Sequence, residues 1–140
     1  MARFNIIQFQ HGKEKFSIDF KKELTIDEDQ LIEDLESAAA NYGYYAILKA
    51  KVGRHLSDLE LQKQKQYSEV FLVTKEDPDS SRPPSDKHAD ATAFESERFI
   101  DLCEEVNEVK ETHEMLWGLL KSYEFKINLM QTLSANNRNH

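Results

Sequence analysis

Four glutamates in one short segment are the best candidates for chemistry in this sequence. The segment EEVNEVKETHE begins at residue 104, and its spacing places carboxylates three and four positions apart on one face of a predicted helix. They are Glu104, Glu105, Glu108 and Glu111. Carboxylate oxygens are the ligands that Mg²⁺ prefers, and a bound metal can activate water as a nucleophile. Metal-dependent hydrolysis is therefore the first chemistry to weigh.

An enzyme of that kind needs a second set of carboxylates. All-helical nucleotide pyrophosphohydrolases supply it as a Glu-x-x-Asp motif on a following helix, and nothing after Glu111 provides one. The sequence also has no Gly-rich phosphate loop, no Cys/His cluster at metal-ligand spacing and no nucleophile within a known motif. A solvated acidic face explains the glutamates better. The sequence predicts no enzyme, no metal site and no cofactor.

A basic segment precedes the acidic one. Residues 49–66 contain five Lys or Arg and two acidic residues, a net charge of +3, whereas residues 95–115 contain eight acidic and two basic residues, a net charge of −6. The cations are Lys49, Lys51, Arg54, Lys63 and Lys65. They could contact the phosphates of a nucleic acid, or they could pair with the acidic segment across a helical hairpin. Because the whole chain carries a net charge of −8, any nucleic-acid site must be a local patch.

Long helices must position both charged segments. From Phe99 to Met130 a residue of one stripe recurs at every third or fourth position, and only His113 interrupts its apolar character. This spacing is typical of a long helix packed along another helix. A second stripe runs from Leu31 to Val70 and becomes polar in its second half.

The remaining segments complete the predicted architecture. Residues 1–22 alternate between apolar and polar types around a His-Gly turn, which predicts a β-hairpin. Residues 26–73 form the first helical region, and residues 93–135 form the long C-terminal helix. Residues 75–92 contain all three prolines and no large apolar residue, which predicts a flexible linker. The sequence thus predicts a single, mainly α domain in which the two long helices form an antiparallel hairpin.

Several apolar residues are left over when the seam between the two helices is filled. They are Trp117, Leu119, Phe125, Leu129 and Leu133. Surplus apolar surface on a small protein favours self-association, and the N-terminal hairpin has little else to pack against. The sequence therefore predicts a homo-oligomer with these five residues at its interface.

Composition bears on the cellular compartment. The single cysteine, Cys103, fits a reducing environment, and the N-terminus has no signal-peptide pattern. No apolar run approaches the roughly 20 residues that cross a bilayer. We therefore expect a cytoplasmic protein with no membrane partner.

With this layout, the chain resembles the UvsY-like recombination mediators of tailed phages. The resemblance extends from about Asp19 to Arg138 and rests on the pattern of three segments. They are the acidic entry DFKKELTIDEDQLIEDL, the aromatic-centred helix ANYGYYAILKAKVGRHLSDLELQKQKQYSEVF and the closing stretch LLKSYEFKINLMQTLSANNR. The N-terminal hairpin and the acidic net charge depart from the family pattern.

The resemblance implies a DNA recombination function. It implies a ring-like homo-oligomer in the host cytoplasm that binds single-stranded DNA, contacts the single-strand binding protein and helps a strand-exchange recombinase to load. A basic pair near the end of the family's first long helix contributes to DNA binding, and the matching positions are Lys63 and Lys65. They lie just before Tyr67. Its ring, or those of Tyr42, Tyr44 and Tyr45, could stack on bases, and core packing is the other interpretation of these tyrosines. The alternative is a non-enzymatic scaffold, chaperone or regulator that binds only protein.

Overall fold

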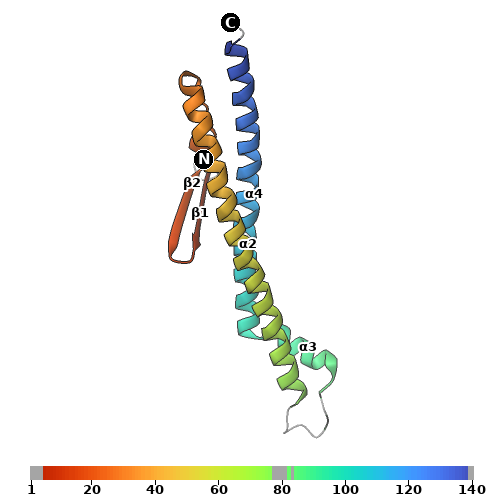
Figure 1. Ribbon diagram of the computed structural model, residues 1–140. Helices are drawn as coiled ribbons and strands as arrows, with labels where there is room; N and C mark the ends of the chain where they lie inside the picture. The colour runs from red at the N-terminus through yellow and green to blue at the C-terminus, as the bar shows by residue number, and fades with distance from the viewer. Residues whose placement is uncertain (1–4, 77–81, 83, 139–140) are drawn as a thin grey trace. The chain divides into compact units, whose positions relative to one another are not determined.

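Helices make up most of the chain, after a short N-terminal β-hairpin (Figure 1). The computed structural model describes residues 5–76, 82 and 84–138. In chain order the elements are β1 (Ile6–His11), β2 (Glu14–Asp19), α1 (Phe20–Leu24), the 3-10 helix η2 (Glu28–Gln30), α2 (Leu31–Lys75), α3 (Asp86–Glu95) and α4 (Glu97–Arg138). The predicted mainly α fold with a small β-hairpin is confirmed.

The chain divides into two compact units. The first unit consists of Met1–Val52 with Thr112–His140, and the second consists of Gly53–Glu111. Helices α2 and α4 contribute to both units and pack side by side within each. In the second unit, Leu59 of α2 packs on Val106 of α4, and Gln66, two turns further along α2, bonds to Ser96 at the start of α4. The two helices are therefore antiparallel, as predicted, whereas the single domain stays a prediction.

The β-hairpin belongs to the first unit. Its two strands are antiparallel, with Ile7 opposite Ile18 and Phe9 opposite Phe16. A two-residue loop joins them, and Gly12 in that loop has a φ of 61°, a conformation that glycine adopts at little cost. Because alternate residues share one face of a strand, these four residues form an apolar face. Both isoleucines on it are buried.

The entry into α2 differs from the prediction. The first helical region was expected to begin at residue 26, but the short helix α1 forms earlier and α2 begins at Leu31. The Asp19 carboxylate accepts a hydrogen bond from the Lys22 amide (3.2 Å) and caps α1. The Asp27 carboxylate accepts one from the Asp29 amide (3.0 Å) and caps η2. Two successive Asp caps thus start two short helices where one longer helix was expected.

The stripe on α4 is confirmed in both units. None of its members is exposed, and those that the structure buries are Phe99, Leu102, Val106, Leu116, Leu120, Tyr123 and Met130. His113 is half-buried and keeps its place in the series. The burial pattern follows because a residue at every third or fourth position returns to the same side of a helix.

The predicted linker, residues 75–92, is wrong at Lys75, which ends α2, and over its last seven residues. Residues 86–92 belong to α3, and residues 77–81 and 83 of the predicted linker lie outside the described residues. Ser85 caps α3 by accepting a hydrogen bond from the His88 amide (3.1 Å), and Ala89 and Ala93 are fully buried. A break at Ser96 then separates α3 from α4, so the C-terminal helix begins at residue 97 instead of 93.

Candidate nucleic-acid interface

The five cations of the basic segment all lie on α2, but they differ in exposure. Lys49 and Lys51 belong to the first unit, and Arg54, Lys63 and Lys65 belong to the second. Lys51, Arg54 and Lys65 are exposed, whereas Lys49 and Lys63 are half-buried. Phosphate contacts need accessible cations, so the three exposed side chains are the better placed for them.

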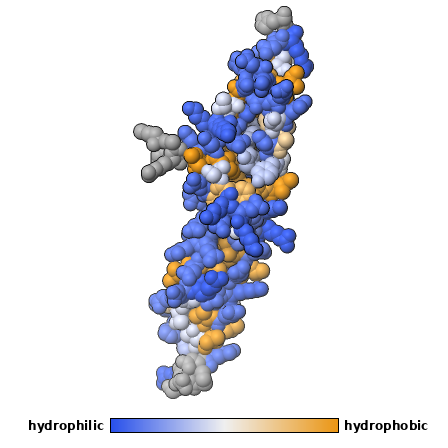
Figure 2. All heavy atoms as spheres, turned by 90° about the vertical axis from the view of Figure 1, so that its left-hand side faces the viewer, coloured by the Kyte–Doolittle hydropathy of each residue, from blue (hydrophilic) through white to orange (hydrophobic). Residues whose placement is uncertain are grey.

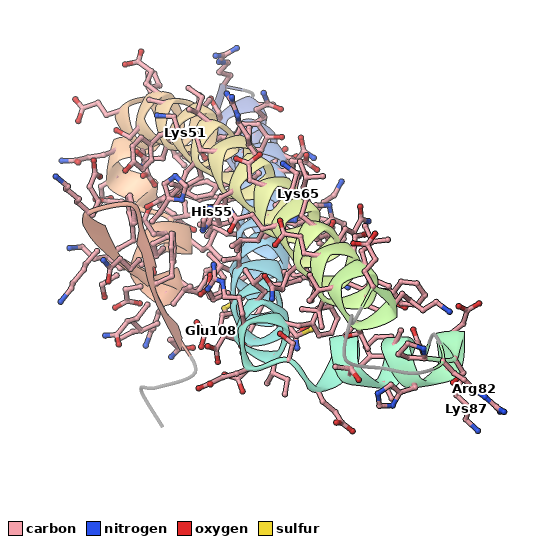
Figure 3. All side chains as sticks on the ribbon, turned by 90° about the horizontal axis from the view of Figure 1, so that it is seen from below. Lys51, His55, Lys65, Arg82, Lys87 and Glu108 are labelled. Atoms are coloured by element: carbon pink, nitrogen blue, oxygen red, sulfur yellow. The ribbon has the colours of Figure 1, made fainter. Side chains whose placement is uncertain are left out.

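The basic pair that the resemblance singles out does not point in one direction. Lys63 lies four residues after the buried Leu59, on the side of α2 that packs against α4 in the second unit. Lys65 is two positions further on, and residues two apart do not share a helix face. Figure 3 labels Lys65 on α2, where it is exposed. Of the pair, Lys65 is the side chain that a ligand can reach without rearrangement.

The structure does not favour the alternative in which these cations are neutralised by the acidic segment. Among the described residues, no carboxylate lies within 4.0 Å of the charged groups of the five cations. Glu105 instead lies beside Arg98 of its own helix, with 3.8 Å between the guanidinium and carboxylate atoms. Of the five, the exposed Lys51, Arg54 and Lys65 are the ones that an external anion could reach.

Tyr67 is engaged inside the second unit. Its hydroxyl donates to the Asp90 carboxylate, and this hydrogen bond raises the pKa of Tyr67. Its ring lies 5.3 Å from Phe94, 6.0 Å from Phe71 and 6.1 Å from Phe99, measured between ring centroids. These contacts favour core packing for Tyr67 over stacking on a base.

The predicted oligomer residues do not share one environment. Leu119 is fully buried in the first unit, so the prediction that it faces outward is wrong. Trp117, Phe125 and Leu129 are 55%, 76% and 52% exposed, and Leu133 is half-buried. These four lie at multiples of four residues along α4, which is the spacing of a surface ridge. We call them the α4 ridge.

Apolar surface also occurs on other elements. Figure 2 shows apolar side chains interspersed among hydrophilic ones on one face of the molecule. In the second unit the exposed large apolar residues include Leu61, Leu72, Val73, Phe94 and Ile100. Single exposed apolar residues are normal in proteins, whereas a row of them is typical of an interface; in the α4 ridge, Lys121 interrupts the row between Trp117 and Phe125.

A buried polar cluster in the first unit was not predicted from the sequence. The Glu23 carboxylate accepts hydrogen bonds from the hydroxyls of Tyr45 (3.1 Å) and Tyr123, and the Glu23 backbone carbonyl accepts one from Lys126 Nζ (2.9 Å). Lys126 Nζ also lies 3.6 Å from the Asp34 carboxylate. We call these five residues the Glu23 cluster. It joins α1, α2 and α4, so its role is to hold α1 in place.

Burial within the Glu23 cluster raises the pKa of two tyrosine hydroxyls. Tyr45 is 8% exposed and Tyr123 is fully buried. Burial raises the pKa of both hydroxyls well above the ordinary value, and the negative charge of Glu23 adds to the effect. A sequence signal existed for this cluster, because Lys126 lies three residues after Tyr123 and four before Met130, on the buried side of α4. A lysine at such a position needs acidic or carbonyl partners.

The acidic segment forms no metal centre in the described part of the chain. Glu104, Glu105, Glu108 and Glu111 are all exposed, and no group of three or more His, Cys, Asp or Glu residues described by the structure could hold a metal ion. In the same described ranges, no helix combines the length and apolar character needed to span a bilayer.

Comparison with known proteins gives matches in structure but not in sequence. No protein-family profile matches the chain, and no curated protein is significantly similar to it in sequence. Two crystal structures of the bacteriophage T4 recombination mediator protein UvsY, in lattice types I and II, match with TM-scores of 0.70 and 0.69. Sequence identity is 11% and 12%. Each match covers 85% of this chain, and the matches cover 93% and 90% of the two UvsY chains, respectively. The chain therefore has a UvsY-like fold.

Proposed function

We propose that this protein is a recombination mediator that binds single-stranded DNA and helps a strand-exchange recombinase to load on it. The observation that carries the proposal is the UvsY-like fold, which extends over 85% of this chain. The bacteriophage T4 protein with this fold, UvsY, is named a recombination mediator protein. The proposed partners are single-stranded DNA, the recombinase and the single-strand binding protein, and the proposed action is non-enzymatic.

The exposed cations of α2 support DNA binding despite the acidic net charge. Lys51, Arg54 and Lys65 are exposed and unpaired within the described residues. Lys51 lies in the first unit and the other two lie in the second, and one or two charges make a weak site. A homo-oligomer would repeat them and convert a weak patch into a multivalent one, because each further contact with the same strand is intramolecular. The α4 ridge supplies an apolar surface for that assembly.

The test is binding of fluorescent oligo-dT across a salt series, with Lys63→Ala and Lys65→Ala made singly and together. Each phosphate contact to single-stranded DNA contributes about 0.7 to the slope of log affinity against log salt. We expect Lys65→Ala to flatten the slope by about 0.7, and the double variant to flatten it by up to about 1.4. Thermal stability should barely change, since neither side chain has an ion-pair partner among the described residues.

A matched control separates a specific site from general charge loss. Lys21 and Lys22 are neighbouring, exposed lysines on α1, outside the basic segment. Lys21→Ala/Lys22→Ala removes the same charge and should leave the salt slope unchanged. Equal losses for the two double variants would reject the basic segment as the site. Absence of any oligo-dT binding at low salt would reject DNA binding itself.

The alternative is a helical scaffold, chaperone or regulator that binds only protein. The α4 ridge favours it, because an exposed apolar ridge serves a protein partner as well as a second copy. The two functions separate in a reconstituted reaction with the recombinase and single-strand binding protein of the same source. A mediator shortens the delay before the recombinase hydrolyses ATP on covered single-stranded DNA, whereas a protein-only scaffold without DNA contacts leaves that delay unchanged.

A further inference from the structure

The tyrosines differ in how the fold uses them. Four of the five donate their hydroxyl hydrogen to a carboxylate of their own unit: Tyr42, Tyr45, Tyr67 and Tyr123. Tyr44 is the exception, since its hydroxyl has no hydrogen-bond partner in the part of the chain that the structure describes. It is also 53% exposed. The fold thus holds the hydroxyls of four tyrosines and leaves that of Tyr44 accessible.

Tyr44 lies on the wall of a groove in the first unit. The groove has a volume of about 210 Å³ and lies between α2 and the β-hairpin. Helix α2 lines it with Tyr44, Ile47, Leu48 and Lys51, and the hairpin lines it with His11, Glu14 and Phe16. The four α2 residues have the spacing of a single helix face. Ile47 is 60% exposed, so the floor of the groove is apolar and open to solvent.

The Tyr44 ring is held in position by the ring of its neighbour, Tyr45. Its centroid lies 5.2 Å from that of Tyr45, and the two rings meet edge to face at 72°. Tyr45 is itself buried and bonded to Glu23. An accessible ring supported by a fixed one is pre-organised, which lowers the entropy cost of stacking on a planar ligand.

A cation lies within reach of any ligand on that ring. Lys51 follows Tyr44 by seven residues, two helical turns or about 10 Å along α2. It is exposed, has no ion-pair partner among the described residues, and is labelled on α2 in Figure 3. Lys13 and Lys15 of the hairpin are also exposed. Glu14 is the one acidic residue of the lining and would repel a phosphate.

We propose that this groove is a base-stacking subsite for single-stranded nucleic acid, in which one base stacks on Tyr44 and a neighbouring phosphate contacts Lys51. The inference rests on the proposed function. The pairing of an accessible aromatic face with a free cation fits a ligand that carries both a planar base and a phosphate. An aliphatic peptide side chain would fill the apolar floor but leave Lys51 without a partner. In this arrangement the base lies over Tyr44 and the phosphate lies at Lys51, in the same groove that Glu14 lines.

The test compares two oligonucleotides of equal length and charge, oligo-dT and the same strand with abasic sites. Tyr44→Leu removes the ring and keeps apolar bulk, and Tyr44→Phe keeps the ring and removes the hydroxyl. Stacking on an aromatic residue changes affinity by about five- to a hundredfold. We expect Tyr44→Leu to weaken oligo-dT binding by at least about fivefold and to leave abasic binding unchanged, while Tyr44→Phe binds both strands like the wild type.

Each other outcome has a definite meaning. Equal losses of Tyr44→Leu on both strands, or no loss on oligo-dT, would overturn the stacking subsite while leaving the proposed function in place. A wild-type protein that binds neither strand would reject the proposed function and the subsite together. Glu14→Gln gives a second readout with the opposite sign, since removal of the repelling carboxylate should strengthen binding of both strands by a few-fold.

Discussion

At the scale of single residues, the buried groups are held by hydrogen bonds and the candidate ligand groups are not. Lys126 is 8% exposed and has two oxygen partners, and the hydroxyls of Tyr45 and Tyr123 share one carboxylate. Buried polar groups without such partners cost about 1–3 kcal/mol each. By contrast, Lys51 and the Tyr44 hydroxyl have no partner in the described residues. The free polar groups of α2 are therefore the ones on which both proposals rest.

The Glu23 cluster predicts a loss of stability in alkali. Burial raises the pKa of Tyr45 and Tyr123 above the ordinary value of 10.0. Above pH 10 the unfolded chain therefore loses these protons while the folded chain keeps them, so the unfolded state binds fewer protons and the free energy of unfolding falls as pH rises. Below pH 10 both states stay protonated, and this contribution is constant.

The measurement is the free energy of unfolding in denaturant between pH 8 and pH 11. The variant Tyr45→Phe/Tyr123→Phe should fall less steeply than the wild type above pH 10, since phenylalanine does not titrate. Parallel curves for the wild type and the double variant would mean that the cluster does not couple folding to protonation.

At the scale of elements, the sequence was a good guide to long, regular segments and a poor guide to short ones. The α4 stripe and the hairpin followed from periods of 3.5 and 2, because burial on one face imposes these periods. Helix α1 has only 5 residues, fewer than a periodic pattern needs. Helix α3 buries Ala89 and Ala93, and small residues give no apolar signal although they allow close packing. Its Ser85 cap was the local signal that could have revealed it.

The candidate site shows the same limit. The sequence located the basic segment on a helix, because charge counting needs no coordinates. It did not separate Lys65 from the half-buried Lys63, and it wrongly placed Leu119 on the surface. Those distinctions depend on how α2 and α4 are rotated toward one another within a unit. A stripe with several apolar flanking residues leaves that rotation undetermined.

The positive φ of Gly12 predicts a measurable cost for any residue with a Cβ at this position. Gly12 has a φ of 61°, which costs a residue with a Cβ about 1 kcal/mol or more, although open space surrounds the position. We expect Gly12→Ala to lower the free energy of unfolding by about 1 kcal/mol. Lys13→Ala, in the same turn, is the control and should have little effect, because Lys13 has no positive φ. Equal stabilities for the two variants would show that the hairpin unfolds independently of the helices.

At the scale of the whole molecule, charge and assembly depend on each other. A chain with a net charge of −8 repels nucleic acid at long range, and only local patches attract it. One chain offers three exposed cations on α2, whereas a homo-oligomer offers that number in every subunit. The proposed DNA binding should therefore depend on self-association more steeply than on any single lysine.

The α4 ridge allows this dependence to be tested without disturbing the fold of one chain. Phe125 is 76% exposed, so Phe125→Asp places a charge at the proposed interface and removes no core contact. We expect light scattering to show a smaller assembly, and oligo-dT binding to weaken by more than tenfold as multivalency is lost. Gln131→Asp adds the same charge at an exposed α4 position outside the ridge and should change neither property. Lys65→Ala should weaken binding while the mass stays constant. If Phe125→Asp kept the wild-type mass, or if the wild type were a monomer at tens of micromolar, the ridge would not be the self-association surface, and the acidic chain would need another source of multivalency.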